Sequence, residues 1–164
     1  MTEINLRPDC GRCAALCCVA LAFDRGVLFA FDKPAGAACG HLTEAGRCAI
    51  HTARARRGFA GCVGYDCLGA GQRVTQDLFD GRSWRGEPGL LGPMSEAFAV
   101  VRRAHELLVL LRQARRLPLS PDEGWRLTEL EASLVAAKAS AGAVGGLEAD
   151  VRQFLHGLRR LVGS

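Results

Sequence analysis

The cysteines of this chain are confined to its first part. Four lie close together in the sequence CGRCAALCC, and four more follow at Cys39, Cys48, Cys62 and Cys67. The rest of the chain contains none. One segment is therefore built to use sulfur, and the other folds without it. Eight thiols could form four disulfides, bind metal or react as free thiols, and the cellular compartment separates the first option from the others.

The N-terminal sequence favours reduced thiols. MTEINLRPDC has no apolar run of the length of a signal peptide, so we expect a cytoplasmic protein, in which thiols stay reduced. The apolar stretch from Leu107 to Leu111 is bracketed by arginines and falls short of the roughly 18 to 20 residues of a membrane span, so we expect no membrane association. Metal binding is the favoured use of the sulfur.

The spacing CxxCxxxCC is typical of a ligand cluster. In CxxC, two thiolates reach one ion from a tight turn, and a cysteine three or four positions later lies one helical turn away. Thiolates suit zinc and iron-sulfur clusters equally, and eight sulfurs allow two metal sites. Because adjacent side chains tend to point apart, we expect Cys17 and Cys18 to serve different sites. The candidate metal ligands are Cys10, Cys13, Cys17, Cys18, Cys39, Cys48, Cys62 and Cys67.

The chain contains, in this order, CGRCAALCC, a Cys-x-x-Leu element from Cys39 to Leu42, a Gly-Arg-Cys-x-Ile element from Gly46 to Ile50, and the pair Cys62 and Cys67. In this order the elements resemble the YkgJ-like family of cysteine-cluster domains, which is described as zinc- or iron-chelating. The resemblance covers roughly residues 8–70 and implies a metal-binding fold but no activity. The run GCVGYDCLGAGQRVTQ is also similar to the cysteine-rich N-terminal region of some actinobacterial pentapeptide-repeat proteins, although no such repeats follow it here.

Other residues near the cysteines are weaker candidates. His41 and His51 could complete a site of three cysteines and one histidine, but eight cysteines already fill two tetrahedral sites. Arginines at positions 47, 54, 56 and 57 would offset the negative charge of a metal bound by thiolates. One Tyr and two Trp offer few rings on which bases could stack, which argues against nucleic-acid binding.

The second part of the chain predicts three helices. Apolar residues recur at helical spacing over about residues 95–117, 120–140 and 147–163, and Ser120 to Glu123 has the sequence of a capping box. Three glycines, Gly142, Gly145 and Gly146, are expected to separate the last two helices.

Between the cysteines, Val19 to Gly36 contains two β-rich runs around Asp24-Arg25-Gly26 and predicts a β-hairpin. We therefore expect an α+β protein with a small cysteine-rich metal-binding domain over residues 1–80. A linker rich in glycine and proline over residues 81–93 and a helical domain over residues 94–164 follow it.

These patterns favour a cytosolic metal-binding protein that holds zinc or an iron-sulfur cluster and carries a helical module for packing or partner binding. Two alternatives stay open, namely an iron-sulfur redox or oxidant-sensing accessory protein and a metallochaperone with an exchangeable site. No Ser/His/Asp or paired-carboxylate arrangement stands out, so the sequence favours a non-enzymatic role without settling it. Besides the metal ion, the candidate partner is another protein or a second copy of this chain, bound through the C-terminal helices.

Overall fold

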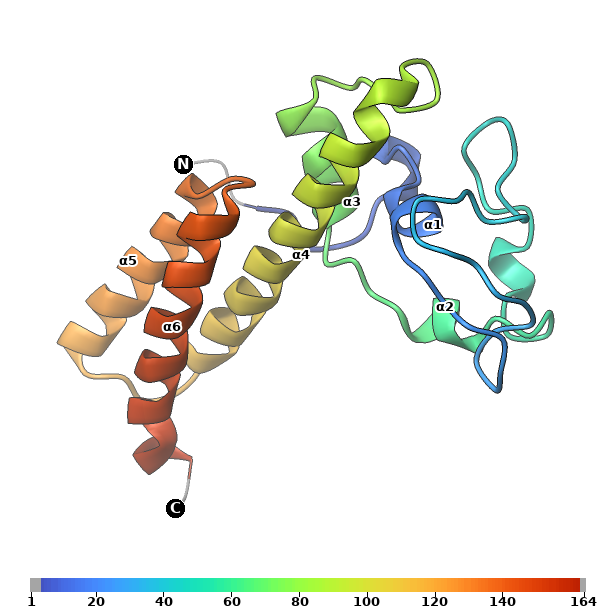
Figure 1. Cartoon of the computed structure of the whole chain (residues 1–164). Coiled ribbons are helices and arrows are strands. Elements are labelled where there is room, and N and C mark those ends of the chain that lie inside the picture. Colours follow the sequence, from blue (N-terminus) through green and yellow to red (C-terminus); the bar gives the residue numbers. More distant parts are fainter. Residues whose placement is uncertain (1–3, 163–164) are drawn as a thin grey trace. The chain divides into compact units, whose positions relative to one another are not determined.

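The regular structure of this protein is helical. The computed structural model describes residues 4–162, and no β-strand forms within them. The α-helices are α1 (Leu16–Ala20), α2 (Ala60–Gly64), α3 (Ala70–Gln72), α4 (Leu91–Ala114), α5 (Pro121–Ala136) and α6 (Ala141–Gly157), as Figure 1 shows. Short 3-10 turns occupy Cys10–Arg12, His51–Ala53, Pro88–Leu90 and Leu158–Leu161, and a π-helical turn, Arg73–Leu78, continues α3.

The chain divides into two compact units. Residues 7–98 form one, which we call the cysteine unit, and residues 4–6 together with 99–162 form the other, the helical unit. Helix α4 begins in the cysteine unit and ends in the helical unit. In the part of the chain that the structure describes, no helix combines the length and the apolar character needed to cross a membrane.

The expected α+β fold with a β-hairpin is wrong. In the predicted hairpin, one isolated antiparallel bridge joins Phe23 and Lys33, whose amides and carbonyls bond each other at 3.0 and 2.8 Å. The next donor that would extend this ladder is the amide of Arg25, but it donates to Asp32 Oδ1 at 2.6 Å instead. A side-chain carboxylate thus competes with the ladder and ends it after one pair.

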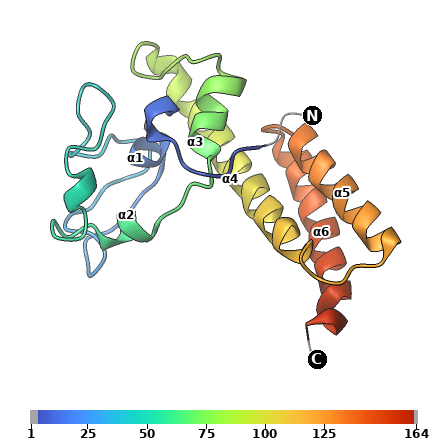
Figure 2. The ribbon, with the colours of Figure 1, turned by 180° about the vertical axis from the view of Figure 1, so that it is seen from behind.

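The helical unit has a continuous apolar core. Figures 1 and 2 show the second half of α4 beside α5 and α6, and the core lies between these three helices. Helix α5 begins as predicted, because Ser120 Oγ accepts from the Glu123 amide and the Glu123 carboxylate accepts from the Ser120 amide. The capping box is therefore confirmed. Fully buried core side chains include Leu107, Leu111, Leu127, Leu130, Leu134 and Val151.

Helix α6 starts earlier than expected. Its first residue is Ala141, and the hydroxyl of the preceding Ser140 accepts the amide of Ala143 as an N-cap. The three glycines that were expected to separate the last two helices therefore lie inside α6. Each glycine in a helix interior destabilises the helix by about 1 kcal/mol relative to alanine. Burial of Val144 and Val151 on the same helix, together with the cap, outweighs that cost.

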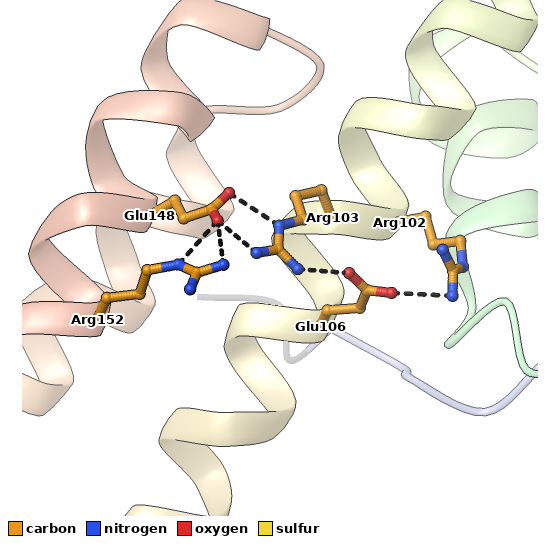
Figure 3. A network of polar contacts seen from close by, with 5 residues as sticks. All are labelled: Arg102, Arg103, Glu106, Glu148 and Arg152. Carbon is orange, nitrogen blue, oxygen red and sulfur yellow. Dashed lines mark hydrogen bonds and ion pairs between the residues drawn. The ribbon is translucent and has the colours of Figure 1, made fainter. Parts of the chain in front are cut away.

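A network of ion pairs joins α4 to α6 within the helical unit (Figure 3). Glu148 on α6 accepts hydrogen bonds from Arg103 on α4 and from Arg152 on its own helix, at 2.8 and 2.9 Å. Glu106 contacts Arg103 at 2.8 Å and Arg102 at 2.9 Å. The bonds from Arg103, and then those from Arg152, lower the pKa of Glu148 to about 2. The carboxylate of Glu148 thus binds arginines of both helices.

The core predicts a difference between two adjacent leucines of α4. Leu111 is fully buried, whereas Leu110 is 44% exposed. Leu111→Ala should lower the free energy of unfolding by about 2–5 kcal/mol because it leaves a cavity among three helices. The matched control, Leu110→Ala, should cost less than about 1 kcal/mol. Urea denaturation followed by circular dichroism measures both, and equal losses would contradict this account of the core.

The ion-pair network predicts a dependence of stability on pH. The folded-state pKa of Glu148 lies below its usual 4.5, so the ionised carboxylate stabilises the fold above that pH. This contribution is lost as the pH falls from about 4.5 towards 2. Glu148→Gln should therefore weaken the helical unit at neutral pH and remove part of its destabilisation by acid.

The control for this prediction is Glu129→Gln, which removes a carboxylate that contacts an exposed arginine of its own helix at 2.6 Å. Unfolding midpoints measured between pH 7 and pH 2 compare the two variants. An acid dependence in Glu148→Gln that is as steep as that of the parent would speak against the network.

Candidate metal centre

All eight predicted ligands lie in the cysteine unit. None of them is paired in a disulfide, seven of them are partly buried, and Cys10 is exposed. The unit places them on short turns and on three brief helices, α1, α2 and the 3-10 turn at Cys10–Arg12. What positions the sulfurs is therefore the set of hydrogen bonds between these segments.

The first cysteine segment is held by the helical segment that follows Cys67, namely α3 and its π-helical continuation. Three polar side chains of this segment hydrogen-bond the backbone of residues 7–14. The bonds run from Gln72 Nε2 to the Arg7 carbonyl (2.7 Å), from the Asp9 amide to Gln72 Oε1 (3.1 Å), from the Ala14 amide to Thr75 Oγ1 (3.0 Å) and from Gln76 Nε2 to the Arg12 carbonyl (2.8 Å). Cys10 and Cys13 are thereby held beside the chain that carries Cys67.

Gly71 allows this approach. A Cβ at this position would lie 2.4 Å from Cys13 Sγ, which is closer than atoms can come without movement, and 3.4 Å from Cys13 Cβ, which is an ordinary contact. Helix α3 therefore packs against the Cys13 side chain through a residue that has none. The spacing of the cysteines alone did not predict this contact.

Three further cysteines, Cys39, Cys48 and Cys62, are linked to the segment of Cys18 by contacts of the backbone. The Cys39 amide donates to the Cys18 carbonyl at 2.9 Å, and an isolated antiparallel bridge brings Cys48 back to the turn after Cys39. The guanidinium of Arg54 then donates to the Cys62 carbonyl at 2.8 Å, which ties the turn after Cys48 to α2. Residues far apart in the sequence thus converge on Cys18.

The charges that act on the thiols mostly link the same neighbours, although Cys18 also raises the pKa of Cys10. Burial raises the pKa of Cys13 to about 11, and the charges of Cys67 and Cys10 add to that rise. Burial also raises the pKa of Cys62, and the charges of Cys18, Cys39 and Cys48 raise it further. We call Cys10, Cys13, Cys17 and Cys67 the first quartet, and Cys18, Cys39, Cys48 and Cys62 the second quartet.

The two quartets adjoin at Cys17 and Cys18, whose Sγ atoms are 3.9 Å apart. A hydrogen bond between these thiols raises the pKa of Cys17 and lowers that of Cys18. The charges of Lys33, Arg54 and Arg85 lower the pKa of Cys18 further, against the effect of its burial. Among the thiols whose pKa is shifted, Cys18 is the one whose pKa is lowered.

Among residues 4–162, no three Cys, His, Asp or Glu side chains converge closely enough to hold an ion as they stand. Each quartet is thus a neighbourhood of sulfurs rather than a finished coordination shell. Binding an ion would require the sulfurs of a quartet to come closer together.

The histidines and arginines singled out in the sequence have different surroundings. His41 packs against the rings of Phe31 and Phe59, with ring centroids 5.6 and 5.0 Å apart. His51 is exposed and begins a 3-10 turn. Of the four arginines, Arg54 acts on the thiols of both quartets, since its charge opposes the rise in the pKa of Cys10 and of Cys62.

Residues 83–86, which we call the strap, lie in the segment that the sequence predicted to be a linker, and they contact the cysteine segments. The indole N–H of Trp84 donates to the Ala14 carbonyl at 2.7 Å. Arg85 stacks on the Trp84 ring at 5.0 Å and donates to the carbonyls of Thr43 and Glu44 at 3.0 Å each. The strap therefore connects the segment between Cys13 and Cys17 to the turn between Cys39 and Cys48.

Comparison with known proteins yields a relative in Bacillus subtilis (strain 168), which is named "Uncharacterized protein YybG". It is 38% identical over 116 residues, which make up 71% of this chain and 42% of that protein. The chain therefore spans less than half of its relative's length. No family model matches the chain, and no solved structure matches it. The resemblance to YkgJ-like domains stays a prediction.

The contact of Gly71 with Cys13 predicts a selective effect of alanine. Gly71→Ala should lower the free energy of unfolding of the reduced, metal-free protein by about 1–3 kcal/mol, because either the sulfur or α3 must move. The matched control is Gly64→Ala in α2, where an added Cβ meets nothing within 4 Å. Thermal unfolding measures both variants. If they melt alike, α3 does not hold the Cys13 side chain as described.

Proposed function

We propose that the cysteine unit binds metal through its eight thiolates, as two adjoining sites formed by the first and the second quartet. The observation that carries this proposal is that hydrogen bonds within the cysteine unit bring together the segments that carry eight free thiols, with no disulfide among them. A partly buried cluster of thiols packs no better than apolar side chains would, so we attribute the cluster to the chemistry of sulfur.

The donor set suits soft metals. Four thiolates form the tetrahedral shell of structural zinc or hold an iron-sulfur cluster, whereas calcium and magnesium require oxygen ligands. The arrangement of the described residues supports both zinc and iron equally. The close contact of Gly71 with Cys13 also supports the proposal, because it keeps one sulfur of the first quartet directed at the segment that carries Cys67.

Metal binding would be coupled to proton release and to folding. Burial raises the pKa values of Cys10, Cys13, Cys39 and Cys62, so these thiols keep their protons in the metal-free protein near neutral pH. A metal ion displaces those protons, and the binding free energy adds to the stability of the fold. In this proposal the helical unit serves as a module for packing or partner contact, since it contains no sulfur ligand.

The proposal predicts how metal content responds to single ligand changes. The protein, purified without oxygen and analysed by native mass spectrometry, should carry two metal ions or two clusters and contain eight reduced cysteines. Cys67→Ser and Cys18→Ser should each lose about one metal equivalent, because an incomplete four-thiolate site loses much of its affinity. Ala45→Ser, at an exposed position of the same unit, is the control and should keep full metal content.

Two results would contradict the proposal. The first is full metal content in both Cys67→Ser and Cys18→Ser. The second is a native protein without metal whose mass shows four disulfides. A colourless protein with zinc would identify a zinc site, whereas a visible absorption band with iron and sulfide would identify a cluster and favour a redox or sensing role.

A further inference from the structure

Lys33 carries its side chain into the interior of the cysteine unit. The residue is 4% exposed, and its Nζ lies 5.6 Å from the centre of the Phe23 ring. Its ammonium donates to the carbonyls of Val19 (3.2 Å), Pro34 (3.1 Å) and Ala37 (2.8 Å). These three bonds use all the donors that an ammonium group has.

The acidic groups that act on the charge of Lys33 are thiols. Burial lowers the pKa of Lys33, and the charges of Cys39, Cys18 and Cys17 oppose that effect, in this order. Two of these three cysteines belong to the second quartet. The carbonyls satisfy the hydrogen bonds of the ammonium but supply no full charge, and protonated thiols supply none either.

A buried ammonium is costly unless an opposite charge lies near it. That charge exists here once the neighbouring sulfurs are thiolates, and a zinc ion with four thiolates carries a formal charge of −2. The same lysine also joins the segments on which two of the sulfurs lie. Val19 follows Cys18 and Ala37 precedes Cys39, and the Cys39 amide bonds the Cys18 carbonyl directly at 2.9 Å.

We propose that Lys33 is the counter-ion and positioning residue of the metal site formed by Cys18, Cys39, Cys48 and Cys62. This inference rests on the proposed function and extends it, because it assigns to a residue that is not a ligand the tasks of balancing the site's charge and of holding two ligand segments together. Of the first quartet, Cys17 also acts on Lys33 through its charge, after Cys39 and Cys18.

The test compares zinc binding by full-length variants in reducing buffer, by competition with a chromophoric chelator. Lys33→Met keeps a side chain of similar length and removes the charge, and Lys33→Arg keeps the charge. Lys33→Met should weaken the binding of one of the two zinc equivalents by roughly tenfold or more, because an unscreened charge of opposite sign is lost near the thiolates. The other equivalent should stay within about twofold, and Lys33→Arg should retain most of the affinity of both.

Arg25→Met, which removes an exposed cation from the same loop, is the matched control and should leave both affinities unchanged. If Lys33→Met does not fold, Lys33→Gln takes its place, since it keeps a donor for the carbonyls without the charge. Zinc affinities of the uncharged variant that match those of the parent would overturn this inference alone, and so would an equal loss in Lys33→Arg. A parent protein that takes up no metal overturns the proposed function, and this inference with it.

Discussion

Hydrogen bonds from side chains to the backbone hold the cysteine unit together. A segment with two isolated bridges and a few short helical turns leaves many amides and carbonyls without regular partners, and buried ones must find them elsewhere. Gln72, Thr75 and Gln76 supply these partners to residues 7–14, and Lys33 and Arg85 supply them to the turns around Cys39. The sulfurs are near one another because the backbone that carries them is tied in this way.

The two units obtain their stability differently. The helical unit buries a leucine-rich core between three helices and adds ion pairs centred on Glu148. The buried residues of the cysteine unit include Lys33, Gln72 and Thr75 beside its apolar ones. Buried polar side chains stabilise a fold less than apolar packing does, so binding of metal by thiolates would add what the apolar core of this unit lacks.

Local patterns in the sequence predicted local structure, and tertiary contacts decided the rest. The capping box at Ser120 and the three helices after residue 90 follow from short-range chemistry, although α6 includes glycines that were expected to precede it. The β-hairpin failed because one aspartate, Asp32, takes the amide needed for the ladder. The eight cysteines were evident from their spacing. Gln72 and Lys33 carry no local signal, since their roles depend on segments distant in the sequence.

X-ray absorption spectroscopy of the native, anaerobically purified protein tests the central claim most directly, because it measures the atoms bound to the metal. The account predicts a first shell of sulfur alone, with four sulfurs per metal at about 2.3 Å for zinc. A shell dominated by nitrogen or oxygen, or a mean of two sulfurs or fewer per metal, would contradict it. Either result would mean that the two quartets of thiols are not the metal-binding groups of this protein.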